Sequence, residues 1–514
     1  MKHLVVIPFE SNFTVPNRLF TTLENIEVLA HKNEDITVLY CDGGPVNLCW
    51  TNPDCNKGMC RYCKMYKKLF FKVLPKNVKL LPSSQVFKAS KEDYDKLQFS
   101  YKTNEDIKKI YYKNVGIGYA ALSAYLTSTR NLFPLCDEFF CHYMDGNLRA
   151  GVYMTDLINA ALDLVHPDQV ESFNSRFVYA RPVYDTCKNR NVDILVLEDC
   201  GGRNGRNKRF NYFNAPPHSI SANLEYMNQC WDSDYMPVEE KIKIGESFFY
   251  NRRNAIPAGD KVYVKDQQVG LLPDNWDPTK HNIVIFNSSE DELAALGEEF
   301  EERVYPSQFH GIADIFRMNK DAKDYHFYLR VHPNLKDIPF AYHTKLYELD
   351  KISDNVTVIP GNSPVSTYAL MDAAEKIIVF GSSTGTEAAY WGKPVILLSN
   401  CLYAPLNLCY RPQNREELQE MIYSELPPKD NLPAIKIAYS RFFEELPDFE
   451  YFPYRLHWRK MFGRNVSYIK LLNPKHWWLN VFTAPIRWLG TIHRHRKCFY
   501  YTVCNEDVSQ LEAK

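Results

Sequence analysis

Residues 381–387 combine the groups that a phosphate-binding turn requires. Among them are two glycines, three consecutive hydroxyl side chains and a carboxylate, namely Gly381, Gly385, Ser382, Ser383, Thr384 and Glu387. A buried strand is predicted just before them, and a helix beginning near Thr386 would direct unpaired N–H groups and a positive dipole at the turn. The pattern predicts an anion site, most naturally for a phosphate, with Glu387 accepting hydrogen bonds from a ribose or sugar hydroxyl. An ordinary helix start with an acidic first turn accounts for the same residues.

A second group of candidate ligands ends the strand predicted at residues 325–331. Arg330 and His332 stand at its end, and Pro333 stops it. Ligands of open parallel sheets bind beyond the carboxyl ends of the strands, so both residues should lie near the turn at 381–387 if the two strands share a sheet. His332 can then donate to a phosphate oxygen, or carry positive charge while a leaving group departs. A hydrogen-bonded structural histidine is the alternative.

Three carboxylates at predicted strand ends are candidates for a general base, which a hydroxyl acceptor needs. Glu198 and Asp199 follow the apolar run at 192–198, and Asp42 follows the run at 35–41. Neighbouring side chains of an extended segment point to opposite faces, so only one of Glu198 and Asp199 should face an acceptor, and we favour Glu198. Each of the three could instead cap a helix or pair with a nearby arginine.

These motifs resemble those of a known family. Arg330-Val331-His332-Pro333, followed by the turn at 382–387 and by Gly392-Lys393-Pro394, is similar to the donor half of bacterial capsule polysaccharide biosynthesis glycosyltransferases. It also resembles the His-Pro and Ser-Ser motifs of bacterial sialyltransferases and Kdo transferases. Segments at 173–177, 181–182 and 193–201 resemble the acceptor side of these families. One departure affects the base, because Cys200 separates Asp199 from Gly201 where the family pattern has two acids followed directly by glycine.

The resemblance implies a GT-B fold, in which two Rossmann-like domains face each other across a cleft. It implies transfer of a sugar, with inversion, from a UDP-linked or CMP-linked donor to a saccharide or lipid-linked saccharide acceptor in capsule or surface polysaccharide synthesis. Asp232-Ser-Asp234 resembles a metal-binding motif of another glycosyltransferase class but lacks a flanking strand, so no obligatory metal is expected. Two other functions fit the same layout: a non-hydrolysing UDP-sugar epimerase, which needs no acceptor, and a non-catalytic scaffold for polysaccharide assembly.

Strand and helix patterns alternate in two blocks, which predicts an α/β chain with two doubly wound parallel sheets. Strands are expected at 3–9, 35–41, 78–81, 192–198, 282–287, 325–331, 355–359, 376–380 and 395–398, with a small-residue helix at 116–131. Residues 251–281 are rich in Asn, Pro and Gly and are expected to form the hinge. The expected organisation is an acceptor-side domain at 1–260, a donor-binding domain at 261–454 and a tail at 455–514.

Composition agrees with a cytoplasmic two-domain enzyme. The chain has 514 residues, 45% of them hydrophobic, and a net charge of −1, which argues against general nucleic-acid binding. Pro8 and Glu10 interrupt the first apolar run too early for a secretory signal, and no run approaches the roughly twenty apolar residues of a membrane span. The fourteen cysteines therefore suggest free thiols. A structural zinc is the alternative for four of them, Cys49, Cys55, Cys60 and Cys63.

The tail differs in composition from the rest of the chain. Residues 455–498 contain ten Lys or Arg and no Asp or Glu, together with Trp458, Trp477, Trp478 and Trp488. Basic charge combined with tryptophan and aliphatic residues is typical of a segment that lies on an anionic leaflet. The tail is thus expected to place the enzyme on the inner face of the cell membrane; packing on the N-terminal domain is the alternative.

Overall fold

The computed structural model describes residues 1–10, 16–43, 49, 51–52, 56–201, 207–256, 263–301, 304–442, 449–452, 457–461, 464–468, 477–497 and 505–511. The chain divides into two compact units. Unit 1 comprises Met1–Thr129, Pro134–Pro217 and Glu444–Asn505, and unit 2 comprises Arg130–Phe133, His218–Phe443 and Glu506–Lys514. The division after Pro217 falls earlier in the chain than the expected boundary at residue 260, because two helices that precede residue 260 pack on a later helix of unit 2.

Unit 1 is built on a six-stranded sheet in the order β3-β2-β1-β4-β5-β6. Its strands are β1 (Lys2–Val6), β2 (Asp35–Tyr40), β3 (Val78–Pro82), β4 (Gln169–Phe173), β5 (Asp193–Gly201) and β6 (Asn207–Phe213). All neighbours are parallel except β6, which pairs antiparallel with β5. The strand order reverses between β1 and β4, so the ligand-binding crevice of such a sheet is expected at the carboxyl ends of these two strands.

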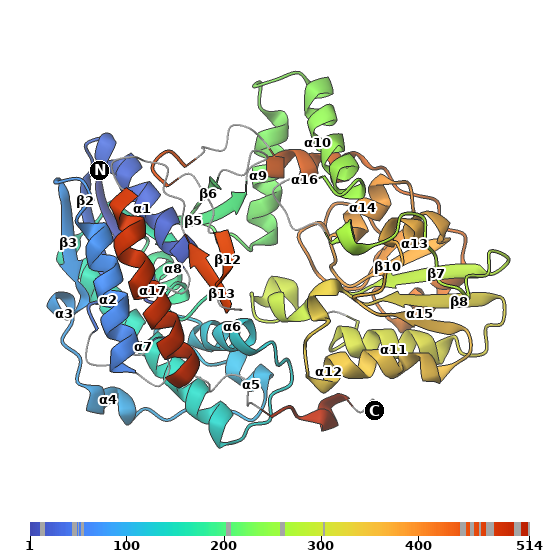
Figure 1. Cartoon of the computed structure of the whole chain (residues 1–514), viewed down its shortest axis with the longest axis horizontal. Helices are drawn as coiled ribbons and strands as arrows, with labels where there is room; N and C mark the ends of the chain where they lie inside the picture. Colours follow the sequence, from blue (N-terminus) through green and yellow to red (C-terminus); the bar gives the residue numbers. More distant parts are fainter. Residues whose placement is uncertain are drawn as a thin grey trace. The chain divides into compact units, whose positions relative to one another are not determined.

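Helices flank both faces of this sheet (Figure 1). The helices of unit 1 are α1 (Pro16–His31), α2 (Lys57–Phe71), α3 (Ser83–Val86), α4 (Lys91–Asp95), α5 (Asn104–Lys108), α6 (Ile117–Thr129), α7 (Glu138–Val165), α8 (Arg181–Asn189) and α17 (Trp477–Lys497), of which α17 packs on α2. A separate hairpin consists of β12 (His457–Met461) and β13 (Arg464–Tyr468). Helix α6 is the predicted small-residue helix, and it is buried from Ile117 to Leu126 because small side chains allow close packing on every face.

Unit 2 contains a five-stranded, fully parallel sheet in the order β11-β10-β7-β8-β9. Its strands are β7 (His281–Phe286), β8 (Tyr325–Arg330), β9 (Val356–Ile359), β10 (Lys376–Val379) and β11 (Val395–Leu397). Its helices are α9 (Ile220–Asp232), α10 (Val238–Arg253), α11 (Gln308–Met318), α12 (Ala341–Thr344), α13 (Thr367–Ala373), α14 (Thr384–Tyr390), α15 (Arg415–Tyr423) and α16 (Leu432–Phe442). Here the order reverses between β7 and β10.

The predicted α/β class is confirmed, since each unit is a parallel-rich sheet wound in both directions. Two Rossmann-like units in one chain are the composition of the GT-B fold. Helices α9 and α10 belong to unit 2 because both pack on α16, where Trp231 and Tyr439 meet edge to face. No helix among the described residues is long and apolar enough to cross a membrane.

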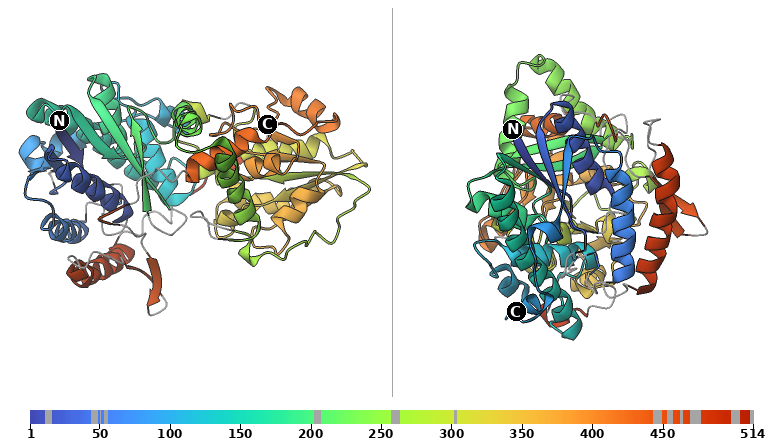
Figure 2. Two further views of the ribbon diagram at one scale, coloured as in Figure 1. Left: turned by 90° about the horizontal axis from the view of Figure 1, so that it is seen from above. Right: turned by 90° about the vertical axis from the view of Figure 1, so that its left-hand side faces the viewer.

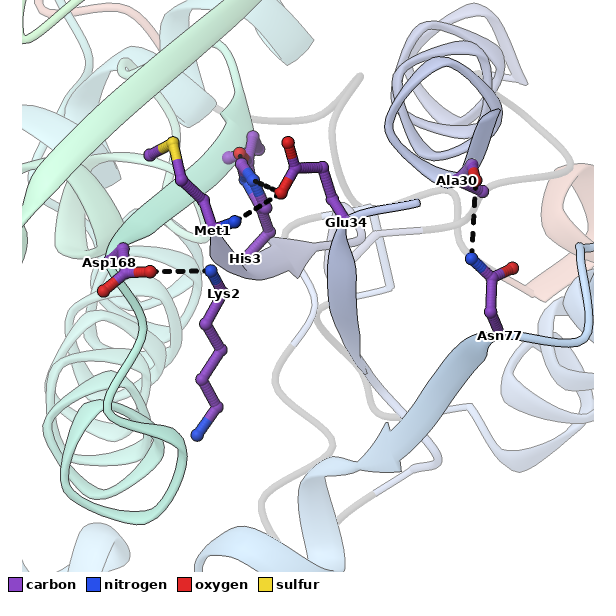
Figure 3. A network of polar contacts seen from close by, with 8 residues as sticks. Met1, Lys2, His3, Ala30, Glu34, Asn77 and Asp168 are labelled. Carbon is purple, nitrogen blue, oxygen red and sulfur yellow. Dashed lines mark hydrogen bonds and ion pairs between the residues drawn. The ribbon is translucent and has the colours of Figure 1, made fainter. Parts of the chain in front are cut away.

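A polar network fixes the amino end of β1 (Figure 3). The N-terminal amino group pairs with Glu34, and the backbone N–H of Lys2 donates to Asp168 at 2.7 Å. His3 Nδ1 lies 2.5 Å from Glu171 Oε1. Burial lowers the pKa of His3, but the hydrogen bond and charge of Glu171 raise it overall. The network ties β1 to its neighbours at the edge opposite the strands' carboxyl ends.

Gly118 occupies a position of α6 that has no room for a side chain. A Cβ atom there would lie 1.7 Å from the carbonyl oxygen of Ile107, and the N–H of Gly118 donates to the carbonyl of Ile110. Gly118→Ala is therefore expected to destabilise unit 1 by roughly 3 kcal/mol or more, the upper range for overpacking. Gly146→Ala in α7 is the matched control, because no atom lies within 4 Å of its added Cβ, and it should stabilise by about 0.5–1 kcal/mol. Urea denaturation measures both, and equal stability of the two variants would contradict the prediction.

Candidate functional site

A pocket opens at the carboxyl end of the unit 2 sheet, where the strand order reverses. It encloses about 610 Å³, counting the solvent at its mouth. Residues at or just beyond the carboxyl ends of β7, β8 and β10 line it, together with side chains from α10 and α13. The lining residues are Arg252, Tyr263, Val264, Phe286, Asn287, Arg330, His332, Pro333, Thr367, Tyr368, Ser383, Thr384 and Glu387. The pocket brings together the predicted candidates Arg330, His332, Ser383, Thr384 and Glu387.

His332 is held by its neighbours in one orientation. Its backbone N–H donates to Asn287 Oδ1 at 2.8 Å, and its Nδ1 accepts the N–H of Asn334 at 3.1 Å. The Tyr263 ring and the imidazole meet in a T-shaped contact at a centroid distance of 5.3 Å. Because Nδ1 is an acceptor, the neutral imidazole carries its proton on Nε2. The imidazole of His332, which lines the pocket, is therefore held in one orientation with its proton on Nε2.

The turn at 382–387 differs from the expected phosphate loop in one respect. The N–H groups of Gly385, Thr386 and Glu387 already donate to the carbonyls of Ser382 and Ser383. The prediction that these N–H groups are unpaired is wrong, because α14 starts tightly and has only seven residues. What the turn offers the pocket is the side chains of Ser383 and Thr384.

Ser382 and Gly385 shape this turn. Ser382 is 5% exposed, and its Oγ lies 3.2 Å from Thr384 Oγ1 and accepts the N–H of Thr384. A Cβ at Gly385 would lie 2.5 Å from the hydroxyl of Tyr403, so only glycine fits. Neither residue lines the pocket.

Glu387 holds two pocket residues that sequence reasoning missed. Its Oε1 accepts from Arg252 Nε at 3.1 Å, and its Oε2 accepts from the hydroxyl of Tyr368. The side chain is 6% exposed. Burial and the charge of Glu387 raise the pKa of Tyr368, so this hydroxyl remains a donor. Both oxygens of Glu387 are engaged by protein groups, which places Glu387 in the wall of the pocket as the anchor of Arg252 and Tyr368.

Arg330 is buried behind the pocket surface. Its two terminal nitrogens donate to the carbonyls of Pro360 and Ser363, at 2.8 and 3.1 Å. Its Nε has no hydrogen-bond partner among the described residues, and burial lowers the pKa of Arg330 to about 10. The guanidinium thus braces the loop after β9 and leaves a buried positive charge beside the pocket, where an anion would be favoured.

A second cluster lies at the carboxyl end of the unit 1 sheet. Glu198 of β5 accepts from Asn174 Nδ2 at 2.8 Å. Burial, followed by the charge of Asp199, raises the pKa of Glu198 to about 7. Nearby, Arg18 donates to Glu10 at 2.8 Å and covers the Phe177 ring at 4.3 Å. A carboxylate with a pKa near neutrality is suited to accept a proton at physiological pH.

The other two base candidates have different surroundings. Asp199 lies inside the β5–β6 ladder opposite Arg209, because β5 continues to Gly201 instead of ending at residue 198. Asp42 accepts from the hydroxyls of Ser83 and Ser84 and from the N–H of Ser84, and despite partial burial these bonds lower its pKa. Asp42 therefore caps α3, and its carboxylate is a poor proton acceptor.

The cysteine cluster is described only in part, because Cys55 lies outside the described residues. Cys49 lies 3.0 Å from the Thr51 hydroxyl, Cys60 accepts from Asn52, and Cys63 contacts the carbonyl of Glu10. Among the described residues no group of three or more His, Cys, Asp or Glu side chains could hold a metal ion. A zinc site that includes Cys55 stays a prediction.

Fold and site together define a two-unit α/β protein whose second unit carries a cationic, hydroxyl-lined pocket at the switch point of a parallel sheet. No protein-family model and no curated protein matches the chain. Solved structures with a similar fold include a beta Kdo 2,4 transferase, KpsC, of Thermosulfurimonas dismutans, with 14% identity, a TM-score of 0.35, and coverage of 53% of this chain and 79% of that one. A UDP-GlcNAc 2-epimerase of Neisseria meningitidis, bound to UDP-GlcNAc, has 13% identity, a TM-score of 0.29, and coverage of 87% and 99%.

Proposed function

We propose that this protein is a glycosyltransferase that takes a sugar from a nucleotide-sugar donor bound in the unit 2 pocket. The observation that carries the proposal is the pocket's set of donors: His332 Nε2–H, the hydroxyls of Ser383 and Thr384, and the buried charge of Arg330. Such a set suits a phosphate that gains negative charge when its bond to the sugar breaks. The position at a topological switch point is also where nucleotides bind in related sheets.

The reaction proposed is an inverting, metal-independent transfer to a saccharide acceptor. The acceptor hydroxyl attacks the anomeric carbon, the bond to the nucleotide phosphate breaks, and the phosphate leaves as an anion next to His332. We assign the acceptor's proton to Glu198, whose raised pKa makes it a competent base near neutrality. The motif resemblance supports a UDP-linked or CMP-linked donor and a lipid-linked acceptor of a bacterial surface polysaccharide.

Thermal stabilisation by nucleotides tests the donor assignment. The purified chain would be melted with UDP, CMP, GDP or ADP, since a ligand at about one hundred times its dissociation constant adds about 2.7 kcal/mol. Stabilisation by UDP or CMP that is lost in His332→Asn is expected. Stabilisation by none of them would overturn the donor site.

The reaction itself is tested with the donor alone. Incubation of UDP-GlcNAc without an acceptor, followed by NMR, should leave the sugar configuration unchanged. Accumulation of the 2-epimer would overturn the proposed transferase and show that the protein is an epimerase that uses the same pocket.

A further inference from the structure

Helix α17 is apolar on the side that faces away from α2 and the rest of unit 1. Its inner face packs along α2, with Leu479 and Ile486 in the same core cluster as Tyr66 and Phe70. The outer face exposes four large apolar side chains, Val481 (56%), Phe482 (60%), Trp488 (43%) and Leu489 (43%). The spacing of these residues places them on one side of the helix. Exposed apolar surface of this kind marks an interaction site.

Helix α2 adds positive charge directly beside this face. Figures 1 and 2 show α2 and α17 lying side by side, and His493 joins them by a contact of 2.7 Å with Asn56. Along α2, exposed cations recur on one face, at Lys57, Arg61, Lys68 and Lys72. Within the described residues, none of these four side chains pairs with a carboxylate.

The charge of both segments has a single sign. Residues 55–91 contain ten Lys or Arg and no acid, as do residues 455–498. Beside the exposed Phe482 and Trp488 of α17, the exposed cations of α2 complement a surface that is anionic outside and apolar beneath. A folded acidic protein would match the positive charge but would not require so large an exposed aromatic face. Nucleic acid would offer no apolar partner for the aliphatic side chains of Val481 and Leu489.

We propose that α2 and α17 together form a docking surface for an anionic phospholipid bilayer, with the outer face of α17 inserted among the headgroups and the α2 cations bound to lipid phosphates. Such a helix lies in the interface and inserts roughly 5–10 Å deep. This proposal does not depend on the reaction proposed above, because none of its residues lines the unit 2 pocket or belongs to the Glu198 cluster.

Vesicle co-sedimentation of the full chain tests the proposal, using phosphatidylcholine vesicles with and without phosphatidylglycerol. We expect binding only to the anionic vesicles, and weaker binding at high salt. The triple variant Lys57→Gln, Arg61→Gln, Lys68→Gln should reduce the partition coefficient by about tenfold or more. The matched control, Lys320→Gln, Lys323→Gln, Lys351→Gln, removes the same charge from exposed sites of unit 2 and should bind as the unaltered chain does.

The apolar contribution is tested separately by Phe482→Ser, Trp488→Ser, which alters only exposed side chains and should leave the melting temperature unchanged. Its binding should fall by about tenfold or more. Lipids with brominated acyl chains should quench tryptophan fluorescence, and Trp488→Phe should reduce that quenching. Absence of binding, equal binding to neutral vesicles, or binding that survives both the α2 and α17 variants would overturn the proposal.

Discussion

Glu198→Gln is expected to lower kcat by a factor of about 10²–10⁴, the usual contribution of a general base. Glutamine has nearly the same shape and can keep the hydrogen bond with Asn174, but it cannot accept the acceptor's proton. Sugar transfer to a saccharide acceptor, measured at saturating donor, gives the rate. Asp42→Asn is the control, and it should keep most of the activity because Asp42 caps α3. Loss of activity in Asp42→Asn with activity retained in Glu198→Gln would move the base to Asp42.

The same residue predicts a pH profile. Since the pKa of Glu198 is raised to about 7, kcat/KM should rise with pH and level off above neutrality, with about a tenth of the plateau at pH 6. Asp199→Asn removes a charge that raises this pKa, so its profile should shift to lower pH. An unshifted profile would contradict the assignment.

Ionisation of Glu198 should lower the stability of the fold, whereas the same ionisation increases activity. The folded state holds this proton more tightly than the unfolded state, whose carboxyl has the ordinary value of 4.5, so the contribution to stability is lost as pH rises from about 4.5 through about 7. Glu198→Gln should therefore raise the melting temperature more at pH 8 than at pH 5. A base that destabilises the fold when ionised is typical of an active site.

His332→Asn is expected to lower kcat by about 10²–10³, the cost of removing one preorganised donor to a developing anion. The asparagine carbonyl can still accept the N–H of Asn334, as His332 Nδ1 does, so the local turn and the stability of unit 2 should be retained. What is lost is the Nε2–H donor. Steady-state kinetics and nucleotide binding report this loss.

His332→Ala separates the two roles of the histidine. It removes the donor and the cap together, so it should lose the same activity and, in addition, about 1 kcal/mol of stability. Full activity in His332→Asn would show that His332 serves only as a cap.

Sequence reasoning found the strands that are buried on both faces. Runs such as 325–331 and 376–380 are rich in aromatic and aliphatic residues, so their type and position were predicted to within one or two residues of β8 and β10. Strands β4 and β6 were not among the predicted strands. Only Val170 and Phe173 of β4 are apolar, and the burial of Glu171 between them is compensated by His3 of the adjacent strand; β6 is an edge strand rich in polar residues. Because His3 is distant from Glu171 in the sequence, their pairing leaves no pattern in the residues around β4 from which the strand could be predicted.

The candidate site shows the same limit. By itself the sequence determined that Arg330, His332, Ser383, Thr384 and Glu387 would lie at one edge of a sheet, because parallel strands end at a common edge. Only the tertiary structure decided what each group is free to do. It paired Glu387 with Arg252, 135 residues earlier, closed the turn's N–H groups on Ser382 and Ser383, and raised the pKa of Glu198 by burial. Strand ends follow from local periodicity, whereas hydrogen-bond partners and desolvation depend on residues that are distant in the chain and meet only after folding.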